Sequence, residues 1–249
     1  MPRLDQLLAR NLGRSRREVT RLLRRGAVSR PGGETLRAGR TPIELAELPV
    51  ELLVSGVPVR LREHAHLIQH KPVGVVTSRN DPLHPTALDL LEGAPMHALL
   101  RAVGRLDLDA AGLLLWTTDT PMIHALTHPK RRVPRTYHVA LARGWTPPPR
   151  GVDGSIELEL ADRSRPRIVE LEPLAESARH PALEPPEGTG ALATITLLDG
   201  AYHEVKRIFA ALDSHVLRLA RVAHAGLWLP EDLAAGAWRE LDSLPNAAA

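Results

Sequence analysis

Apolar side chains recur at helical spacing in the first residues of the chain, at Leu4, Leu7, Leu8 and Leu12. Residues three and four apart share one face of an α-helix, so this spacing predicts a helix with one buried face. Gly13 follows the last leucine and favours the end of the helix there, because glycine readily adopts the left-handed backbone that closes a helix.

A second helix is predicted to begin at Ser15, which is followed three residues later by Glu18 in the pattern of a capping box. Gly26 favours its end. On a helical wheel the apolar residues of this segment share one face, and its arginines spread over the opposite face: Arg17, Arg21, Arg24 and Arg25. The residues after Gly26, with the tight sequence PGG, are typical of short strands and turns.

Apolar runs in the rest of the chain predict strands rather than long helices. The predicted strands are HLIQH (66–70), VGVVTS (73–78), LLLWTT (113–118), TYHVAL (136–141) and ATITLL (193–198), with helices over 121–126 and 205–212. Two segments rich in proline, glycine and charge, 146–154 and 175–190, are predicted to be exposed loops. The pattern indicates an α+β protein with a mixed, mainly antiparallel sheet.

A chain of 249 residues is long enough for more than one domain. The change in pattern predicts a small N-terminal domain over 1–55, a linker over 56–65 containing Gly56 and Pro58, a larger domain over 66–240 and a tail over 241–249. Because no run of about 20 apolar residues and no signal-peptide pattern is present, a cytoplasmic protein without membrane association is expected.

Composition sharpens this picture at two points. The chain has no cysteine, which excludes disulfides, zinc thiolate sites and thiol nucleophiles. Residues 1–40 contain eleven arginines against three acidic residues, a net charge of +8, which leaves −5 for the remainder given +3 overall. A basic module joined to a mildly acidic body indicates a nucleic-acid-binding appendage. An ordinary solvated surface is the alternative, although few glutamates interleave with the arginines of the second helix.

The sequence GRLDLDAAGLLLWTTD, residues 104–119, places charge directly before a run typical of a buried strand. Arg105 and Asp107 alternate with leucines, so in an extended loop both charged side chains would face the same way, where the cation would hold the carboxylate ionised. From these residues alone, a structural ion pair at the strand entrance is an equal alternative. A metal site at His64, His66 and His70 is a weaker one, because His70 would have to be brought round by a bend and because chance spacing is common in a chain with twelve histidines.

The N-terminal pattern, which opens with RLDQLL and continues through a basic second helix, resembles an S4 RNA-binding domain over roughly the first 50 to 55 residues. This resemblance implies binding of RNA through phosphate contacts and shape. The residues expected to contact RNA here are Arg3, Arg16, Arg17, Arg21, Arg24 and Arg25.

The segment 104–119 resembles the catalytic motif GRLDxxTxGLLLLTxD of the RsuA/RluA group of pseudouridine synthases. Three further blocks agree in order: HKPVGVVTS resembles NKPxGxxxS, RTYHVAL resembles KTYxV, and DGAYHEVKRIF resembles EGRxHQVKRM. Together with the S4-like start, the resemblance to the RsuA/RluB/RluE/RluF type extends from the N-terminus to about Leu229.

The resemblance implies that Asp107 is the catalytic nucleophile, that Tyr137 stacks on the target uracil and that Lys206 is the basic partner of Asp107. It also implies that Arg105 helps to hold the flipped nucleotide, and that Lys71, His203 and Arg207 contact RNA. Isomerisation of uridine needs no redox step, metal or phosphate donor, so no cofactor and no metal is expected. A core position for Tyr137 and a surface charge at Lys206 are the structural alternatives.

Five positions depart from the family pattern: His70, Ala110, Ala201, Glu204 and Asp213. They affect expected RNA contacts and loop geometry rather than the Asp, Tyr and Lys positions. Glu204, beside Lys206, is expected to weaken phosphate binding.

Lys206 in HEVKR, the DPLHPT segment and the LLVSGVPV segment look more like the small-subunit branch, RsuA, than its large-subunit relatives. The expected substrate is therefore one uridine of 16S rRNA, presented in a small-subunit assembly intermediate to a monomeric enzyme. A 23S rRNA uridine is the alternative within the family. A non-catalytic S4 RNA-binding or ribosome-assembly factor is the alternative of another class, disfavoured by the presence of Asp107.

Overall fold

The structure, a computed structural model, describes residues 2–152 and 154–245 and divides into two compact units. Of the described residues, the first contains 2–65 together with 92–101, and the second contains 66–91 together with 102–152 and 154–245. In the part of the chain that the structure describes, no helix has the length and apolar character needed to cross a bilayer.

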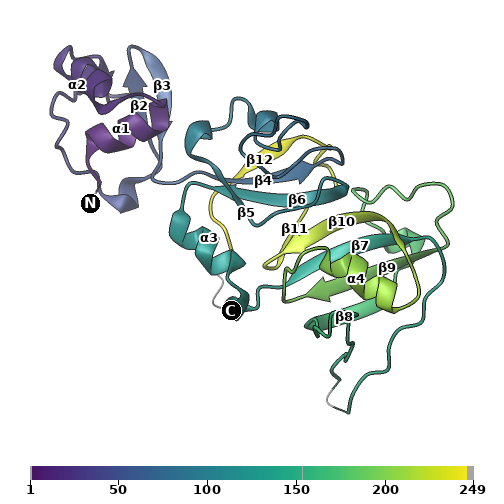
Figure 1. The fold of residues 1–249 in the computed structure, drawn as a ribbon. Helices are drawn as coiled ribbons and strands as arrows, with labels where there is room; N and C mark the ends of the chain where they lie inside the picture. The colour runs from purple at the N-terminus through teal and green to yellow at the C-terminus, as the bar shows by residue number, and fades with distance from the viewer. Residues whose placement is uncertain (1, 153, 246–249) are drawn as a thin grey trace. The chain divides into compact units, whose positions relative to one another are not determined.

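The N-terminal unit begins with two helices, α1 (Leu4–Leu12) and α2 (Arg16–Arg24) (Figure 1). Both helix ends follow the local signals: Gly13 has φ 61° at the end of α1, and Ser15 and Glu18 form the complete capping box of α2. The apolar faces of the helices pack into one core with the strands of this unit, made of Leu4, Leu7, Leu8, Val19, Leu23, Val28, Ile43, Leu52, Val54 and Leu61.

A three-stranded antiparallel sheet, β1 (Val28–Ser29), β2 (Val50–Val54) and β3 (Val57–Leu61), completes this unit. The prediction of a linker over 56–65 is wrong for its first half, because Val57–Leu61 pairs with β2. Ser55 and Gly56, with φ 53° and 82°, form the two-residue turn between the strands. Positive φ at both positions is the geometry of a tight hairpin, not of a linker.

The second unit is built on a nine-stranded sheet in the order β12-β4-β6-β10-β7-β9-β8, with β11 paired to β10 and β5 to β6. Its strands are β4 (His66–Lys71), β5 (Arg101–Val103), β6 (Ala110–Thr117), β7 (Arg135–Leu141), β8 (Ile168–Pro173), β9 (Ala191–Leu197), β10 (Val216–His224), β11 (Leu227–Trp228) and β12 (Trp238–Leu241). Strands β6 and β10 are parallel to each other. The pairs β12–β4, β4–β6, β10–β7, β7–β9, β9–β8 and β10–β11 are antiparallel. The expectation of a mixed, mainly antiparallel sheet is confirmed.

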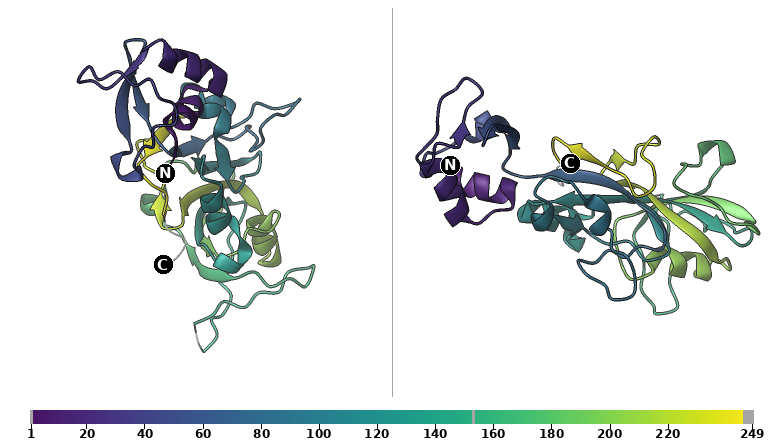
Figure 2. Two further views of the ribbon diagram at one scale, coloured as in Figure 1. Left: turned by 90° about the vertical axis from the view of Figure 1, so that its left-hand side faces the viewer. Right: turned by 90° about the horizontal axis from the view of Figure 1, so that it is seen from above.

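Two helices accompany this sheet, α3 (Thr120–Thr127) and α4 (Glu204–Ala211), and α4 lies beside β10 (Figure 1). Single 3-10 turns occur at Leu45–Glu47, Asp89–Leu91, His97–Leu99, Pro129–Arg131 and Glu176–Ala178. The described residues of the long connection between β7 and β8, 142–152 and 154–167, project away from the sheet (Figure 2). The expected tail, 241–249, lies partly outside the described residues; Leu241 still belongs to β12, and Leu244 is buried.

Four of the five predicted strands are present, as β4, β6, β7 and β9, and both predicted helices are present as α3 and α4. The strand predicted over 73–78 is wrong. Its backbone groups bond instead to two loops: the N–H of Gly74 donates to the carbonyl of Leu108, and that of Val76 donates to the carbonyl of Pro85. The apolar run therefore supports a loop rather than extending the sheet.

The segment 175–190 is not the fully exposed loop that its composition predicts, because His180, Ala182 and Leu183 are buried. Two hydrogen bonds anchor it through His180. The backbone N–H of His180 donates to Nδ1 of His138 on β7 at 3.0 Å, and Nε2 of His180 lies 2.9 Å from the carbonyl of Leu229. The sequence conceals this anchor because proline, glycine and charge dominate the segment.

Burial of His138 predicts acid sensitivity. Burial, with the charges of His180 and Arg179, lowers the pKa of His138 to about 4. Since an unfolded histidine has a pKa near 6.5, the unfolded chain binds this proton more readily, and stability present above pH 6.5 is lost as the pH falls toward 4. In urea unfolding, His138→Gln should lose roughly 2 kcal/mol less stability than the wild type between pH 7 and pH 5. Equal losses in the two proteins would contradict this role of His138.

Candidate active site

The loop that carries Asp107 connects β5 to β6. Hydrogen bonds from residues 74–77 hold it in place. Thr77 Oγ1 accepts a hydrogen bond from the N–H of Leu106 at 3.1 Å and donates to the Leu106 carbonyl at 3.0 Å. Gly74 N–H donates to the carbonyl of Leu108. Leu106 is buried while the side chain of Asp107 is 35% exposed. The leucine anchors the loop, and the next residue presents its carboxylate at the entrance to the buried strand β6.

Two basic side chains of the segment around α4 approach Asp107. Its Oδ2 lies 3.5 Å from Nε2 of His203 and 3.9 Å from Nζ of Lys206. The stronger contact of Lys206 is with Asp109, whose two carboxylate oxygens accept hydrogen bonds from Nζ at 2.8 and 2.7 Å. Lys206 therefore bridges two carboxylates, and its expected pairing with Asp107 is the looser of the two contacts.

The contact with Lys206 affects the pKa of Asp109. Burial acts to raise the pKa of the Asp109 carboxyl, but the hydrogen bond and charge of Lys206 outweigh burial and hold the pKa below its usual value. Asp109 was not among the residues singled out from the sequence. The signal was present in its spacing, because Asp107 and Asp109 flank Leu108 in the same loop.

Arg105 does not make the contact predicted for it. Its side chain is exposed, and among the residues that the structure describes no ion pair joins it to Asp107. Its backbone carbonyl accepts a long hydrogen bond, 3.4 Å, from Nη1 of Arg221. The loop ends in a turn, since the N–H of Ala110 donates to the carbonyl of Asp107.

Lys71 is fully buried, and the expectation that it contacts RNA is therefore wrong. Its Nζ donates to the carbonyls of Pro72 and Ala110 at 2.9 and 2.7 Å, which ties β4 to the first residue of β6. Burial lowers the pKa of Lys71 to about 8, although the carboxylates of Asp107 and Asp109 act to raise it. Lys71 thus supports the loop from behind.

Tyr137 and Arg221 form the buried side of the site. They face each other as partners in the register of β7 and β10. Tyr137 is 9% exposed, and Arg221 is fully buried, with Nε donating to the carbonyl of Leu113 on β6 at 2.8 Å. Strand β10, between β6 and β7, therefore brings Tyr137 and the strand that follows Asp107 into one cross-strand row.

Gly112 makes this row possible. It pairs with Arg221 in the parallel register, has φ 107°, and a Cβ there would lie 2.2 Å from the backbone oxygen of Arg221. Sequence reasoning missed both residues. The available signals were a glycine within an otherwise bulky strand and an arginine within the apolar run LARVA.

Two other charged residues of α4, Arg207 and Glu204, have partners of their own. Arg207 is ion-paired with Asp162 of the projecting connection, so no contact places it near Asp107. Glu204 is buried and accepts a hydrogen bond from the N–H of Ala201, and burial raises the pKa of its carboxyl. The expected effect of Glu204 on phosphate binding is wrong in its premise, because the carboxyl faces inward.

The histidines considered as metal ligands have other contacts. Nδ1 of His66 lies 2.8 Å from Oγ1 of Thr117, and Nδ1 of His70 lies 2.8 Å from the carbonyl of Leu233. Within residues 2–152 and 154–245, no group of three or more histidine or acidic side chains is arranged to hold a metal ion.

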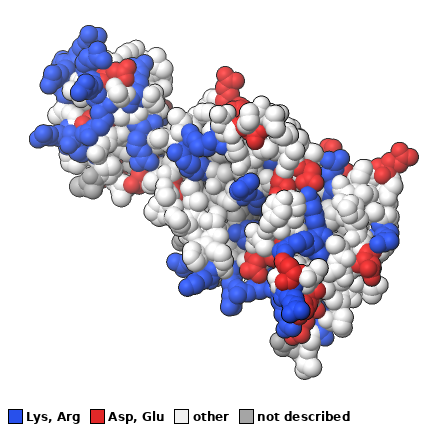
Figure 3. Space-filling view, viewed as in Figure 1, with Lys and Arg blue, Asp and Glu red and all other residues white. Residues whose placement is uncertain are grey.

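A basic surface lies on the N-terminal unit, where the blue side chains that gather in Figure 3 are arginines. Arg17, Arg21, Arg24 and Arg25 are exposed on and beside α2. Arg3 and Arg16 share the buried carboxylate of Asp5, with N–O distances of 2.8 and 2.9 Å. Burial of Asp5 is outweighed by these two arginines, and its pKa is lowered. Part of the charge of Arg3 and Arg16 is therefore balanced within the fold.

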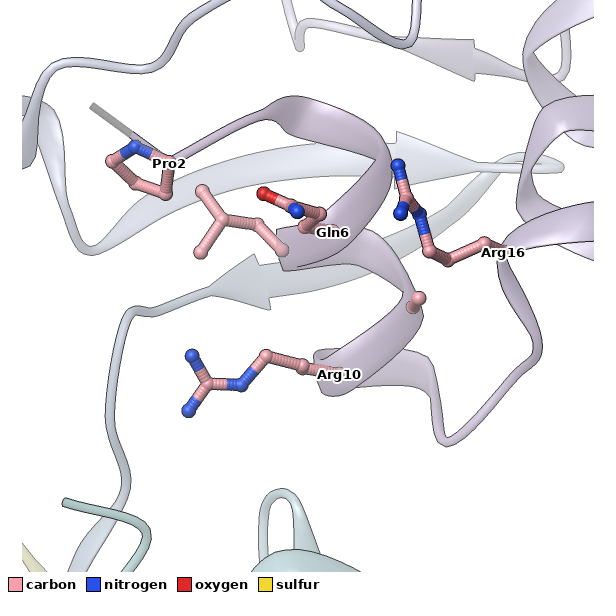
Figure 4. A pocket seen from close by; sticks show the side chains of 6 residues that line it. Pro2, Gln6, Arg10 and Arg16 are labelled. Carbon is pink, nitrogen blue, oxygen red and sulfur yellow. The ribbon is translucent and has the colours of Figure 1, made fainter. Parts of the chain in front are cut away.

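An open hollow of about 370 Å³ lies beside α1 in the same unit (Figure 4). It is lined by Pro2, Gln6, Leu7, Ala9, Arg10 and Arg16. The guanidinium of Arg10 and the amide of Gln6 supply hydrogen-bond donors at its edge, whereas the guanidinium of Arg16 is bound to Asp5.

Comparison with known proteins decides the family. The model of the RNA pseudouridylate synthase family matches residues 65–211, which include the loop of Asp107, Tyr137 and α4. The chain belongs to this family. It is an RNA pseudouridine synthase, an enzyme that isomerises uridine in RNA.

Similar proteins agree over nearly the whole enzyme. It is 35% identical over 239 residues to the ribosomal small subunit pseudouridine synthase A of Vibrio cholerae, covering 96% of this enzyme and 95% of the relative. It is 34% identical over 247 residues to the ribosomal large subunit pseudouridine synthase B of Escherichia coli O6:H1, covering 96% and 79%. A crystal structure of a pseudouridylate synthase, 28% identical, matches with a TM-score of 0.56 and covers 97% and 96%. The RsuA/RluB type predicted from the sequence blocks is confirmed.

Proposed function

We propose that the enzyme converts one uridine of ribosomal RNA into pseudouridine, with Asp107 as the nucleophile. The observation that carries this proposal is the placement of Asp107. Its partly exposed carboxylate stands at the entrance to β6, with His203 and Lys206 within 4 Å and the Tyr137–Arg221 pair on the adjoining strands. A carboxylate beside basic groups and an aromatic ring suits a reaction on a flipped base.

The proposed reaction moves one bond and conserves all atoms. The bond between N1 of uracil and C1′ of ribose breaks, the base turns, and C5 bonds to C1′. The proton of C5 is lost, and N1 gains one. Asp107 would carry the covalent step, whether it attacks the sugar or the base, and the pocket would retain the detached uracil.

Each neighbour has a proposed role in this reaction. The buried ring of Tyr137, which is the partner of Arg221 in the register of β7 and β10, would pack against the uracil. Lys206 would attract the Asp107 carboxylate and keep Asp109 away from the nucleotide, since it already binds Asp109. His203 and the exposed Arg105 would contact the sugar-phosphate backbone of the flipped nucleotide, and Arg207 would do so when released from Asp162.

The N-terminal unit is proposed to be an S4-type RNA-binding domain, with residues 66–240 forming the catalytic domain. Its support is the exposed arginine face of α2, which has few acidic partners. Such a face binds phosphates without reading sequence, and the affinity then depends on salt.

Removing three charges from this face tests its role. Replacing Arg17, Arg21 and Arg24 together by alanine should weaken RNA binding and reduce the slope of log K against log salt by about 2 to 3, because each lost phosphate contact removes about 0.7 to 0.9. The matched control removes three ion-paired exposed arginines of the second unit, Arg150, Arg165 and Arg239. Binding to an rRNA fragment is measured from 50 to 300 mM salt. Equal slopes for the two triple variants would contradict the proposal.

A uridine of the small-subunit 16S rRNA is the proposed target, acted on in the cytoplasm by a monomer. The support comes from motifs: Lys206 in HEVKR and the DPLHPT and LLVSGVPV segments look more like the small-subunit branch than its large-subunit relatives. A small-subunit assembly intermediate is the proposed partner, because a base must be accessible before it can be flipped.

Purified enzyme offered both rRNAs tests this choice. Transcripts of 16S and 23S rRNA are incubated separately with enzyme, and pseudouridine is mapped at nucleotide resolution. One modified uridine in 16S rRNA is the expected result. A single modified site confined to 23S rRNA would support the proposed chemistry but contradict the proposed target. If neither rRNA is modified, either as a transcript or in an assembly intermediate, the proposed rRNA substrate is refuted.

A further inference from the structure

Tyr202 and His203 form a stacked aromatic pair next to Asp107. Their ring centroids are 3.8 Å apart, with an angle of 21° between the ring planes. His203 is the inner ring, since its Nε2 lies 3.5 Å from Oδ2 of Asp107. Tyr202 is the outer ring and is 78% exposed. The pair therefore extends from the carboxylate toward solvent.

The backbone holds this arrangement at a cost. His203 precedes α4 in the left-handed conformation, with φ 49° and ψ 32°. A residue other than glycine loses about 1 to 2 kcal/mol in this conformation, so such a position indicates a constraint imposed by the surroundings. Here the constrained residue is the one that joins the exposed ring to the carboxylate.

The exposure of Tyr202 is unexplained by the fold. The chain contains only two tyrosines, and the other, Tyr137, is buried in the same site. A large aromatic side chain left in water loses the stabilisation that burial would give. With one face covered by His203 and most of its surface exposed, the ring leaves its other face open to a flat apolar ligand.

We propose that the Tyr202–His203 pair is a second stacking platform, which binds the base of a nucleotide next to the target uridine. This inference rests on the proposed function. The buried Tyr137 would face the flipped uracil, and the exposed Tyr202 would hold a neighbouring base and keep it from restacking. Aromatic rings bind single-stranded bases in this way with little preference for base identity.

Three variants of Tyr202 separate stacking from other roles. Tyr202→Phe keeps the ring, Tyr202→Leu keeps an apolar side chain without a flat face, and Tyr202→Ala removes both. Base stacking contributes about 1 to 3 kcal/mol, so the Leu and Ala variants should bind a ten-residue oligouridylate about 5- to 150-fold more weakly, and the Phe variant should bind as the wild type does. Val169→Ala, at an exposed residue of β8, is the control for loss of surface apolar area.

The reaction supplies the second readout. In single-turnover experiments on an RNA that contains the mapped uridine, Tyr202→Ala should mainly raise the RNA concentration needed for the half-maximal rate. The maximal rate should change less. An abasic residue in place of the adjacent nucleotide should weaken RNA binding by the wild type by a similar factor. It should weaken RNA binding by Tyr202→Ala only a little further. Unchanged oligouridylate binding in Tyr202→Ala, or full binding by Tyr202→Leu, would overturn the platform. Because the binding measurement needs no turnover, it judges the platform even if no pseudouridine is formed, a result that would refute the proposed function instead.

Discussion

Asp107→Asn should abolish pseudouridine formation, with a loss of at least about 10⁴-fold in the single-turnover rate, the scale seen when an enzyme loses its nucleophile. The amide has nearly the same shape as the carboxylate and can occupy the same place beside His203 and Lys206. It lacks the negative charge and the nucleophilic oxygen. The measurement is the rate of pseudouridine formation in the rRNA transcript, with RNA binding measured in parallel to show that the variant still engages its substrate.

The matched control is Asp109→Asn, two residues away in the same loop. It removes a carboxylate from the same loop and weakens the hold on Lys206, because the amide keeps only one of the two oxygens that accept from Nζ, but it leaves Asp107 in place. Its expected loss is on the order of 10-fold, through the altered position of Lys206. Comparable losses in the two variants would mean that the carboxylates act together, or that the assignment of the nucleophile to Asp107 is wrong.

Gly112→Ala should lower the free energy of unfolding by about 3 kcal/mol. This is the largest loss expected from the addition of one methyl group to the active-site sheet. The added Cβ would lie 2.2 Å from the backbone oxygen of Arg221 and 2.7 Å from its nitrogen, and φ at this position is 107°. Neither partner is a flexible side chain, so β6 and β10 must separate. Since β6 follows the Asp107 loop and Arg221 is paired with Tyr137 in the register of β7 and β10, the rate should also fall at temperatures where the variant is folded.

Gly226→Ala is the control for this prediction. Its φ is 77°, so alanine is strained there too, but no atom lies within 4 Å of the added Cβ. Its expected cost is about 1 kcal/mol, from the backbone alone. Urea unfolding of both variants at pH 7 measures the difference. Equal destabilisation would show that the close approach of β6 and β10 is relaxed without cost and does not constrain the site.

Local patterns predicted much of the fold because their physical causes are local. The capping box at Ser15 and the glycine after α1 fix helix ends through their own backbone conformations and hydrogen bonds. The bulky run of β6 is a strand buried on both faces, as its lack of alternation indicates. Failures occurred where a distant partner decides. Residues 73–78 have strand-like composition, but their donors are taken by Leu108 and Pro85.

The same distinction applies to the site. Asp107, Tyr137 and Lys206 come from three separate blocks, and motif resemblance singled them out without stating which groups touch. That Lys206 binds Asp109 more closely than Asp107, and that Lys71 is buried, depends on the packing of β4 against β6 and on the approach of α4. The importance of Arg221 depends on strand order, because β10 separates β6 from β7. Sequence spacing alone contains none of this information.

The most direct test of the account is mapping of pseudouridine in the rRNA of cells that lack this gene and are complemented with the wild type or with Asp107→Ala. We expect that one uridine of 16S rRNA loses its modification, that the wild type restores it, and that the stably expressed variant does not. Restoration by Asp107→Ala would contradict the central claim that this carboxylate performs the reaction.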